Sequence, residues 1–467
     1  MNISGFILKI FQWICKFNFG NFEKEEFKKF LRMGLIFALI IGVYWTLRPL
    51  KDAVFIQLVG KYHLPFAKTV SVLALLPLVM FYTKLLGKTS REKMLMILPA
   101  FYGVCTLFFG LLMMAVQGTS EEIASRSFLG LMSTKALGYL WYLFVESFGS
   151  LVVALFWAFA TDTTEAHHAK RGFPLVVAIG QIGGIVLPVS IGGLPHRLGC
   201  TTDALSIISL GVLTLCIIPL VRYFLKATPA QWIASQEGAT ETTKEHEPGF
   251  FEGLKLLLKN RYLLGIFAAN FIYEVVITLF DFNFKLSASS QYSGVALSNY
   301  LSLYGSSVNI ISLACLLLGI SNVTRFLGIG SSLILMPVVV GVALLGFLLN
   351  INSLPFLFAL MVGSKAINYA LNGPALKQLY IPTTPDVKFK AQAWIETFGS
   401  RSSKQVGSMF NMTLAPLQSF FGKLAGQSYY IMLSGILCFP LLALWLVVAV
   451  FLGRRFKKAI REKNVVC

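Results

Sequence analysis

The sequence predicts an all-α membrane protein with about twelve transmembrane helices in two halves of six. Hydrophobic residues make up 56% of the 467 residues, and charged residues only 13%, whereas soluble domains carry roughly 25% charged residues. The mean hydropathy is +0.72. The apolar residues also gather into runs of about 20, the length at which a helix crosses roughly 30 Å of hydrocarbon.

The apolar runs form two sets, separated by the longest polar stretch of the chain. This stretch is rich in Thr, Glu and Gly, a composition typical of a flexible linker. We therefore predict a first half over 32–225, a linker over 226–260 and a second half over 261–453. The predicted helices are 32–50, 65–86, 93–117, 136–161, 172–194, 203–225, 261–285, 296–319, 325–349, 354–381, 390–419 and 429–453.

The distribution of basic residues predicts the orientation in the membrane. The 40 Lys and Arg residues concentrate in the N-terminal segment, the second loop, the linker and the C-terminal tail, and cytoplasmic loops are the ones enriched in these residues. We therefore expect both termini and the linker to be cytoplasmic. Residues 1–31 are interpreted as an amphipathic segment on the membrane surface, not as a signal peptide, and 454–467 as a basic tail. This bias accounts for the net charge of +19 without nucleic-acid binding.

A short repeat relates the two halves. TDTTEAHHAKRG (161–172) and IPTTPDVKFKAQ (381–392) share a Thr-Thr pair, an acid shortly after it and then a Lys. Each follows the fourth predicted helix of its half, on the same side of the membrane. This favours parallel halves related by an axis along the membrane normal, as in major-facilitator transporters.

Several ionisable residues lie inside the predicted helices. Each would cost roughly 2.5 to 3.5 kcal/mol at the bilayer centre, so they must line an aqueous cavity or pair with one another. Some could also snorkel from helix ends or form fixed ion pairs between helices. The set consists of Arg48, Lys51, Asp52, Glu146, Glu274, Asp281, Lys365, Lys377, Glu396, Arg401 and Lys404.

Spacing groups some of these residues on single helix faces. Glu274 and Asp281 are seven residues apart and Lys285 is four further on, so all three form a stripe on one side of the seventh helix, which we expect to point inward. In the eleventh helix Arg401 and Lys404 form a basic strip. Arg and Lys at membrane depth favour an anionic cargo, and phosphate above all.

The same strip of the eleventh helix includes Ser408, and Gly399 and Gly407 leave room there for a close neighbour or a ligand. Tyr273 is one of several aromatic residues that could stack on a base. The fifth helix reads AIGQIGGIVLP, which predicts close helix packing, with Gln181 as the residue that could do more.

Motifs for catalysis and metal binding are missing from the sequence. It has no GxxxxGK[ST] loop and no HExxH, so we expect neither ATP hydrolysis nor peptide hydrolysis. The seven cysteines form no CxxC pair and predict neither a metal site nor disulfides. The histidines at 167 and 168, near Asp162 and Glu165, are interpreted as a solvated loop. We expect no enzyme activity, no cofactor and no obligate protein partner.

Three stretches resemble the nucleotide transporter family, the ATP/ADP translocases of obligate intracellular bacteria and plastids. They are YWTLRPLKDAVF (44–55), VESFGSLVVALFWAFATD (145–162) and LKQLYIPTTPDVKFKAQAWIETFGSRSSKQVGS (376–408). The resemblance implies that the cargo is a nucleotide. In that family two lysines and two glutamates inside the helices are essential, and by motif they fall on Lys51, Glu146, Glu274 and Lys377, with Lys404 as the alternative to Lys377.

One segment departs from the family pattern. Where many members read Phe-Asp-x-x-Lys-Glu before Tyr-Ile-Pro, this chain reads Asn372, Gly373, Pro374 and then Lys377, Gln378. An acid is missing, which leaves other cargoes open: another nucleotide, sometimes carried with protons, or a dinucleotide such as NAD.

The resulting hypothesis is a carrier that works by alternating access in a cell membrane, most simply a bacterial inner membrane, with lipid and nucleotide as its partners. Glu146 and Glu274 would pair with the cations when no cargo is bound, or carry a proton. A major-facilitator exporter of another substrate, a channel and a lipid-handling protein are the alternatives. The residues expected to neutralise the phosphates are Arg48, Lys51, Lys377, Arg401 and Lys404.

Overall fold

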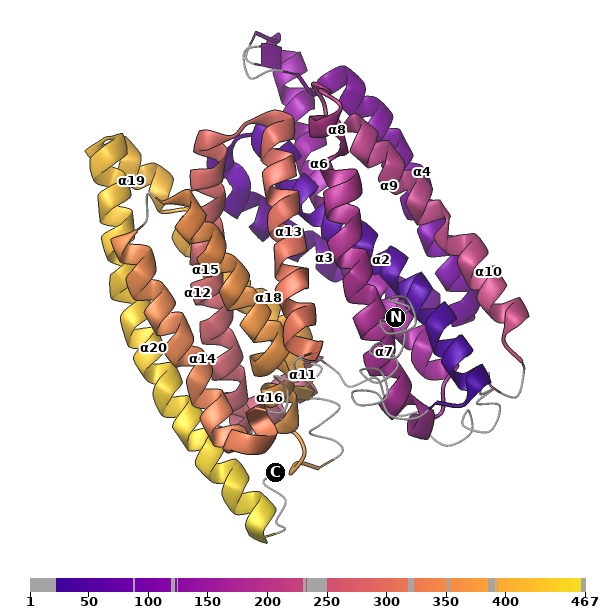
Figure 1. Cartoon of the computed structure of the whole chain (residues 1–467). Coiled ribbons are helices and arrows are strands. Elements are labelled where there is room, and N and C mark those ends of the chain that lie inside the picture. The colour runs from indigo at the N-terminus through magenta and orange to yellow at the C-terminus, as the bar shows by residue number, and fades with distance from the viewer. Residues whose placement is uncertain are drawn as a thin grey trace, which may run out of the picture. The chain divides into compact units, whose positions relative to one another are not determined.

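The computed structural model confirms the all-α prediction, because every regular element in the residues that it describes is a helix (Figure 1). The description covers residues 22–86, 89–118, 122–123, 125–229, 232, 250–317, 323–350, 353–384, 391–392 and 394–462. Most of the predicted N-terminal segment and linker, and the end of the basic tail, lie outside these residues.

The helices follow the predicted apolar runs closely. In the first part of the chain they are α2 (Lys24–Leu58), α3 (Leu64–Leu86), α4 (Arg91–Val116), α6 (Phe128–Asp162), α7 (Ala166–Leu187), α8 (Leu194–Arg197), α9 (Ala204–Leu215) and α10 (Ile217–Ala227). In the second they are α11 (Phe250–Lys259), α12 (Arg261–Gln291), α13 (Gly294–Leu317), α14 (Val323–Leu349), α15 (Leu354–Ile367), α16 (Gly373–Gln378), α18 (Ser400–Asn411), α19 (Leu414–Phe421) and α20 (Lys423–Glu462).

Eleven helices in the described residues are long and apolar enough to cross a membrane, which confirms a polytopic membrane protein. The predicted helix over 390–419 is not among them. Its described part is divided into a π-helix over Ile395–Gly399, then α18 and α19. The physical reason is its composition, because Glu396, Arg401 and Lys404 lower the apolar character that a spanning helix requires.

The ends of α2 show how local sequence sets a helix boundary. At its start Glu23 and Glu26 form a capping box, and the Glu23 amide donates to Glu26 Oε2 at 3.3 Å, which satisfies backbone donors that the first turn leaves open. At its end Gly60 takes φ 113°, a conformation that favours glycine. The chain therefore turns at Gly60 toward α3.

The described helices form two compact units that differ from the two halves predicted along the sequence. The first unit takes α13 from the second half, and the second unit takes the start of α3 from the first half. The halves at 32–225 and 261–453 therefore stay a prediction about the sequence order. The first unit consists of residues 1–61, 73–242 and 289–317, and the second of 62–72, 243–288 and 318–467.

In the first unit α2 and α7 pack backbone against backbone at glycines. A Cβ at Gly42 would lie 2.5 Å from Leu187 Cδ1 and 2.9 Å from the Gly183 carbonyl oxygen, and a Cβ at Gly180 would lie 2.5 Å from the Phe37 ring. Small residues allow this approach, as they do between membrane helices in general. The packing interpretation of AIGQIGGIVLP is therefore confirmed.

In the second unit a buried polar network joins α12, α18 and α20. The Tyr430 hydroxyl donates to Asn411 Oδ1 at 2.6 Å, and Asn283 Nδ2 donates to the Tyr430 hydroxyl at 3.4 Å. Phe282 and Leu414 surround the tyrosine with apolar contacts. Hydrogen bonds between buried groups avoid the cost of desolvating them without partners, so this network fixes the arrangement of the three helices.

Candidate functional site

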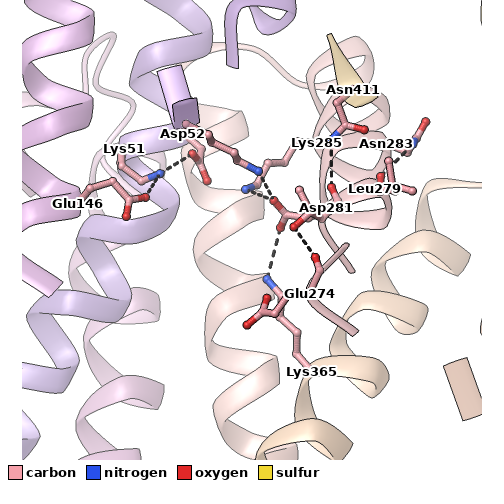
Figure 2. Close-up of polar contacts among 12 residues, drawn as sticks. Lys51, Asp52, Glu146, Glu274, Leu279, Asp281, Asn283, Lys285, Lys365 and Asn411 are labelled. Atoms are coloured by element: carbon pink, nitrogen blue, oxygen red, sulfur yellow. Dashed lines mark hydrogen bonds and ion pairs between the residues drawn. The ribbon is translucent and has the colours of Figure 1, made fainter. Parts of the chain in front are cut away.

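In the first unit one buried lysine bridges two carboxylates. Lys51 Nζ on α2 lies 2.9 Å from Asp52 Oδ1 and 2.9 Å from Glu146 Oε1 on α6 (Figure 2). The Lys51 and Asp52 side chains are each 4% exposed, whereas Glu146 is 36% exposed. The ammonium also lies 3.6 Å from the centroid of the Tyr142 ring, a cation–π contact that adds to its stabilisation.

The helix geometry explains why these groups meet. Lys51 and Asp52 are adjacent on α2, and Glu146 lies near the middle of α6, which packs along α2. One turn before Lys51, the guanidinium of Arg48 lies 5.4 Å from the Trp45 ring centroid. Two predicted site residues, Lys51 and Glu146, therefore form one site, with Arg48 on the same helix.

In the second unit Glu274 pairs with the basic strip of α18. Glu274 Oε1 lies 3.5 Å from Lys404 Nζ and accepts a hydrogen bond from Ser400 Oγ at 3.0 Å. The close approach of α18 to α12 depends on Gly407, whose Cβ would lie 2.9 Å from Thr278 Cβ. Of the two rival lysines, Lys404 is therefore the one that contacts a predicted glutamate.

Asp281, predicted as a secondary site residue, is the centre of a larger cluster. Its carboxylate lies 2.6 Å from Lys285 Nζ, 3.1 Å from Lys68 Nζ and 3.3 Å from Lys365 Nζ. Lys285 is one turn further along α12, which confirms that the two share a face. Lys365, which Figure 2 labels, comes from α15, and Lys68 comes from α3.

The other predicted residues lie apart from these contacts. Lys377 is exposed on α16 and Arg401 is half-buried on α18. Tyr273 is buried with its ring edge-on to Trp445 at 6.2 Å, so the structure gives it a packing contact. Asn372 donates to Asn368 Oδ1 at 2.7 Å. Gln181 keeps a buried Oε1 that accepts no hydrogen bond within the described part of the chain.

His168 is part of a helix rather than of the solvated loop expected from the sequence. It lies in the first turn of α7, and its Nδ1 is 2.7 Å from Glu26 Oε1, with Arg171 3.1 Å from the same oxygen. Asp162 instead pairs with Arg91. The reason is that the loop is shorter than predicted, so that α7 brings His168 against the buried start of α2. Among the described residues no group of acidic, histidine or cysteine side chains could hold a metal ion.

Two residues of these networks escaped the sequence analysis. Lys68 lies near the start of an apolar run, where a lysine usually snorkels, and its partner Asp281 is 213 residues away. Asp203 is fully buried and accepts hydrogen bonds from Gln117 Nε2 and Ser298 Oγ, both at 2.8 Å. It is the first residue of the predicted helix 203–225, and the sequence analysis did not single it out.

The buried Asp203 predicts a pH-dependent stability. Burial raises the pKa of its carboxyl, and the hydrogen bonds from Gln117 and Ser298 offset only part of this shift. A raised pKa in the folded state means that folding favours the protonated acid, so stability is lost as the pH rises through that pKa. Asp203 Oδ1 also accepts no hydrogen bond from the described residues.

We therefore expect Asp203→Asn to stabilise the protein by about 1 kcal/mol at pH 8 and to change little at about pH 3.5, below the ordinary pKa of an Asp carboxyl, because the amide resembles the protonated acid. Thermal unfolding in detergent at both pH values measures this. Equal destabilisation at both values would mean that the charged form is the one that the fold requires.

The fold and these intramembrane charge pairs together define a polytopic membrane transporter. Two solved structures share the fold. The nucleoside transporter NupG matches with a TM-score of 0.61 and 14% sequence identity, and the match covers 90% of this chain and 98% of NupG. A bacterial homologue of the iron transporter ferroportin in an inward-facing state matches with a TM-score of 0.60 and 11% identity, covering 92% of this chain and 98% of the homologue. The major-facilitator-like fold class predicted from the sequence is thus confirmed.

Comparison at the sequence level gives the family. A model of the TLC ATP/ADP transporter family matches residues 11–456, and the chain belongs to this family. It is 23% identical over 489 residues to ADP,ATP carrier protein 1 of Rickettsia prowazekii (strain Madrid E), covering 95% of this chain and 96% of the relative. It is 26% identical over 496 residues to the plastidic ATP/ADP-transporter of Solanum tuberosum, and this match covers 96% of this chain and 76% of the plant protein. The predicted family resemblance is confirmed.

Proposed function

We propose that this protein exchanges nucleotides across a membrane, with ATP and ADP as the first candidates. Its membership of the TLC family and the names of its relatives support this cargo. The observation that carries the proposal is Lys51, an ammonium held at 4% exposure between two carboxylates inside membrane helices. A buried charge of this kind is costly to keep without a function.

The charge pairs in each unit support exchange as the mode of transport. Lys51 and Lys404 each pair with a carboxylate, and a phosphate can replace these carboxylates because it forms the same charge-assisted hydrogen bonds. A carrier that changes conformation with a phosphate bound keeps its lysines neutralised. Glu146 and Glu274 in this proposal are the internal counter-ions. We assign Arg48, Lys377 and Arg401 to the same binding role from the sequence; Arg48 shares α2 with Lys51, and Arg401 shares α18 with Lys404.

The proposal also includes the topology. Both termini and the linker lie in the cytoplasm of a bacterial cell, because the basic residues concentrate there, and transport requires no obligate partner of another kind. Cysteines introduced at the termini of a cysteine-free variant test this topology, since an impermeant thiol reagent should label them only after the cells are opened.

The deciding experiment for the cargo uses purified protein in liposomes. Vesicles preloaded with ADP should take up radiolabelled ATP saturably, and vesicles preloaded with buffer should take up at least about tenfold less. Parallel assays with GTP, AMP and NAD, and with an imposed pH gradient, rank the other cargoes and test proton coupling. Absence of stimulated uptake for every nucleotide would contradict the proposal, whereas stimulation by NAD alone would change the cargo but keep the mechanism.

A further inference from the structure

Three lysines from three helices converge on the single carboxylate of Asp281. We call Lys68, Asp281, Lys285 and Lys365 the Asp281 cluster. Three ammonium groups, from α3, α12 and α15, lie between 2.6 and 3.3 Å from one carboxylate. Lys285 sits on the same helix as Asp281 and forms the shortest of the three pairs, while Lys68 and Lys365 reach the same carboxylate from two other helices.

The chemistry of the four groups favours a larger anion than a carboxylate. Each lysine carries three N–H donors, while the two oxygens of Asp281 offer about four acceptor sites in total. The four side chains together carry three positive charges and one negative charge. A phosphate group offers more acceptor oxygens and up to two charges, which matches this set of donors better than Asp281 alone does.

We propose that the Asp281 cluster is a binding subsite for the polyphosphate tail of the cargo, and that Asp281 is the internal anion that holds the three lysines when the tail is absent. This inference rests on the proposed nucleotide exchange and adds how the cargo is selected. Lysine acts as a point charge rather than as a planar fork. The subsite therefore discriminates nucleotides by their number of phosphates and not by their base.

The side chains of the cluster keep a small exposed fraction, which is largest at Lys68. The Lys285, Asp281 and Lys365 side chains are 10 to 11% exposed and that of Lys68 is 21% exposed. Next to Lys68, the Thr69 hydroxyl accepts a hydrogen bond from Gln405 Nε2 of α18 at 2.6 Å. The first turns of α3 are thus held in the second unit by two contacts, and Lys68 has a fixed position at the cluster.

The test compares affinities for nucleotides that differ only in phosphate number. Inhibition constants of ATP, ADP and AMP against labelled ATP exchange are measured in liposomes for the wild type and for Lys68→Gln, Lys285→Gln and Lys365→Gln. Loss of one desolvated charge-assisted contact should weaken the binding of ATP by about 10- to 100-fold. The binding of ADP should weaken less, and that of AMP least. The matched control is Lys423→Gln, an exposed lysine at the start of α20, which should leave all three constants unchanged.

Asp281→Asn should change the affinity for ATP in the opposite direction from the lysine variants. It therefore distinguishes a role in binding from a purely structural role. Removing the competing carboxylate should lower the inhibition constant of ATP several-fold, because the phosphate no longer displaces an internal anion. If the cluster only stabilises the fold, Asp281→Asn and the lysine variants should all lower the melting temperature and leave the ratio of the ATP and AMP constants unchanged. That result overturns the inference.

The outcomes also distinguish this inference from the proposed function. If the wild type exchanges no nucleotide, the proposed function itself fails. If the wild type exchanges ATP but each lysine variant weakens the binding of ATP and of AMP equally, only the proposed subsite is wrong. Should a variant not fold, amine acylation of the wild type gives the answer: ATP should protect Lys68 more than AMP does, with Lys423 unprotected as reference, and equal labelling of Lys68 with and without ATP would overturn the subsite.

Discussion

Replacing Lys51 by Ala is expected to reduce ATP exchange at least about 100-fold, which corresponds to roughly 2.7 kcal/mol. Its ammonium lies 2.9 Å from each of two carboxylates and close over the Tyr142 ring. Without it the cargo loses one phosphate ligand, and two carboxylates remain near each other without the cation that joins them. Preload-stimulated uptake into liposomes measures the effect.

The same substitution also affects folding, so the experiment needs a second arm. Breaking a buried ion pair by removing one partner costs about 3 to 5 kcal/mol, whereas removing both partners costs much less. We therefore expect Lys51→Ala to lower the melting temperature, and the double variant Lys51→Gln, Asp52→Asn to recover much of it without recovering exchange. Lys423→Ala is the control for a lysine outside the site.

Two results would contradict this role of Lys51. A double variant that folds and exchanges ATP at the wild-type rate would remove Lys51 from the transport site. Equal loss of exchange in the Lys423→Ala control would point to a nonspecific effect of charge. Partial activity of Lys51→Arg, by contrast, agrees with the proposal, since the charge remains but the point geometry of the ammonium is lost.

The sequence was sufficient for the helices and for contacts within one helix. Apolar length is a local property, so eleven of the predicted spans appear in the structure. The stripe of Asp281 and Lys285 also followed from their spacing of four residues, and the structure places these groups 2.6 Å apart. Both predictions depend only on helical geometry, which the sequence alone determines.

Contacts between distant helices were beyond the sequence analysis. Lys68 meets Asp281 across 213 residues, and Ser298 meets Asp203 across 95; nothing in the local pattern identifies such partners. The choice between Lys377 and Lys404 was open for the same reason; the structure pairs Lys404 with Glu274 at 3.5 Å, and which lysine binds the cargo stays a prediction. Charge inside an apolar run shows that a partner is needed, but not which one.

The eleventh helix shows the opposite failure, in which a local rule was applied too far. The segment 390–419 was predicted as one span from its length, yet it contains the polar strip with Arg401 and Lys404, and the described part is divided at Gly399 and between Asn411 and Leu414. Irregular backbone at membrane depth is tolerated where it lies within protein. The charges that marked this helix as functional are thus the reason why it is not a regular span.

Substituting Gly183 by Ala is expected to lower stability through helix packing alone, without removing a charge. Its Cβ would overlap the carbonyl oxygen of Ala38, with the carbonyl carbon 2.6 Å away and Ala38 Cα 2.8 Å away. These are backbone atoms of α2, so no side-chain rotation can relieve the overlap and the two helices must separate. Overpacking costs about 1 to 3 kcal/mol and occasionally more, and the rigid neighbour places this site at the upper end.

The measurement is the melting temperature of the purified protein in detergent, together with the yield of folded protein. We expect Gly183→Ala to lower the melting temperature by about 5 °C or more. Gly363→Ala is the matched control, because Gly363 is also a helical glycine and its Cβ would meet no atom within 4 Å; alanine there should be neutral or slightly stabilising, since glycine disfavours a helix. An unchanged melting temperature for Gly183→Ala would mean that α2 and α7 do not approach at this glycine.

Because Lys51 lies on α2, a variant that separates these helices without unfolding the protein should also impair exchange, and that would connect the glycine contact to the position of the lysine.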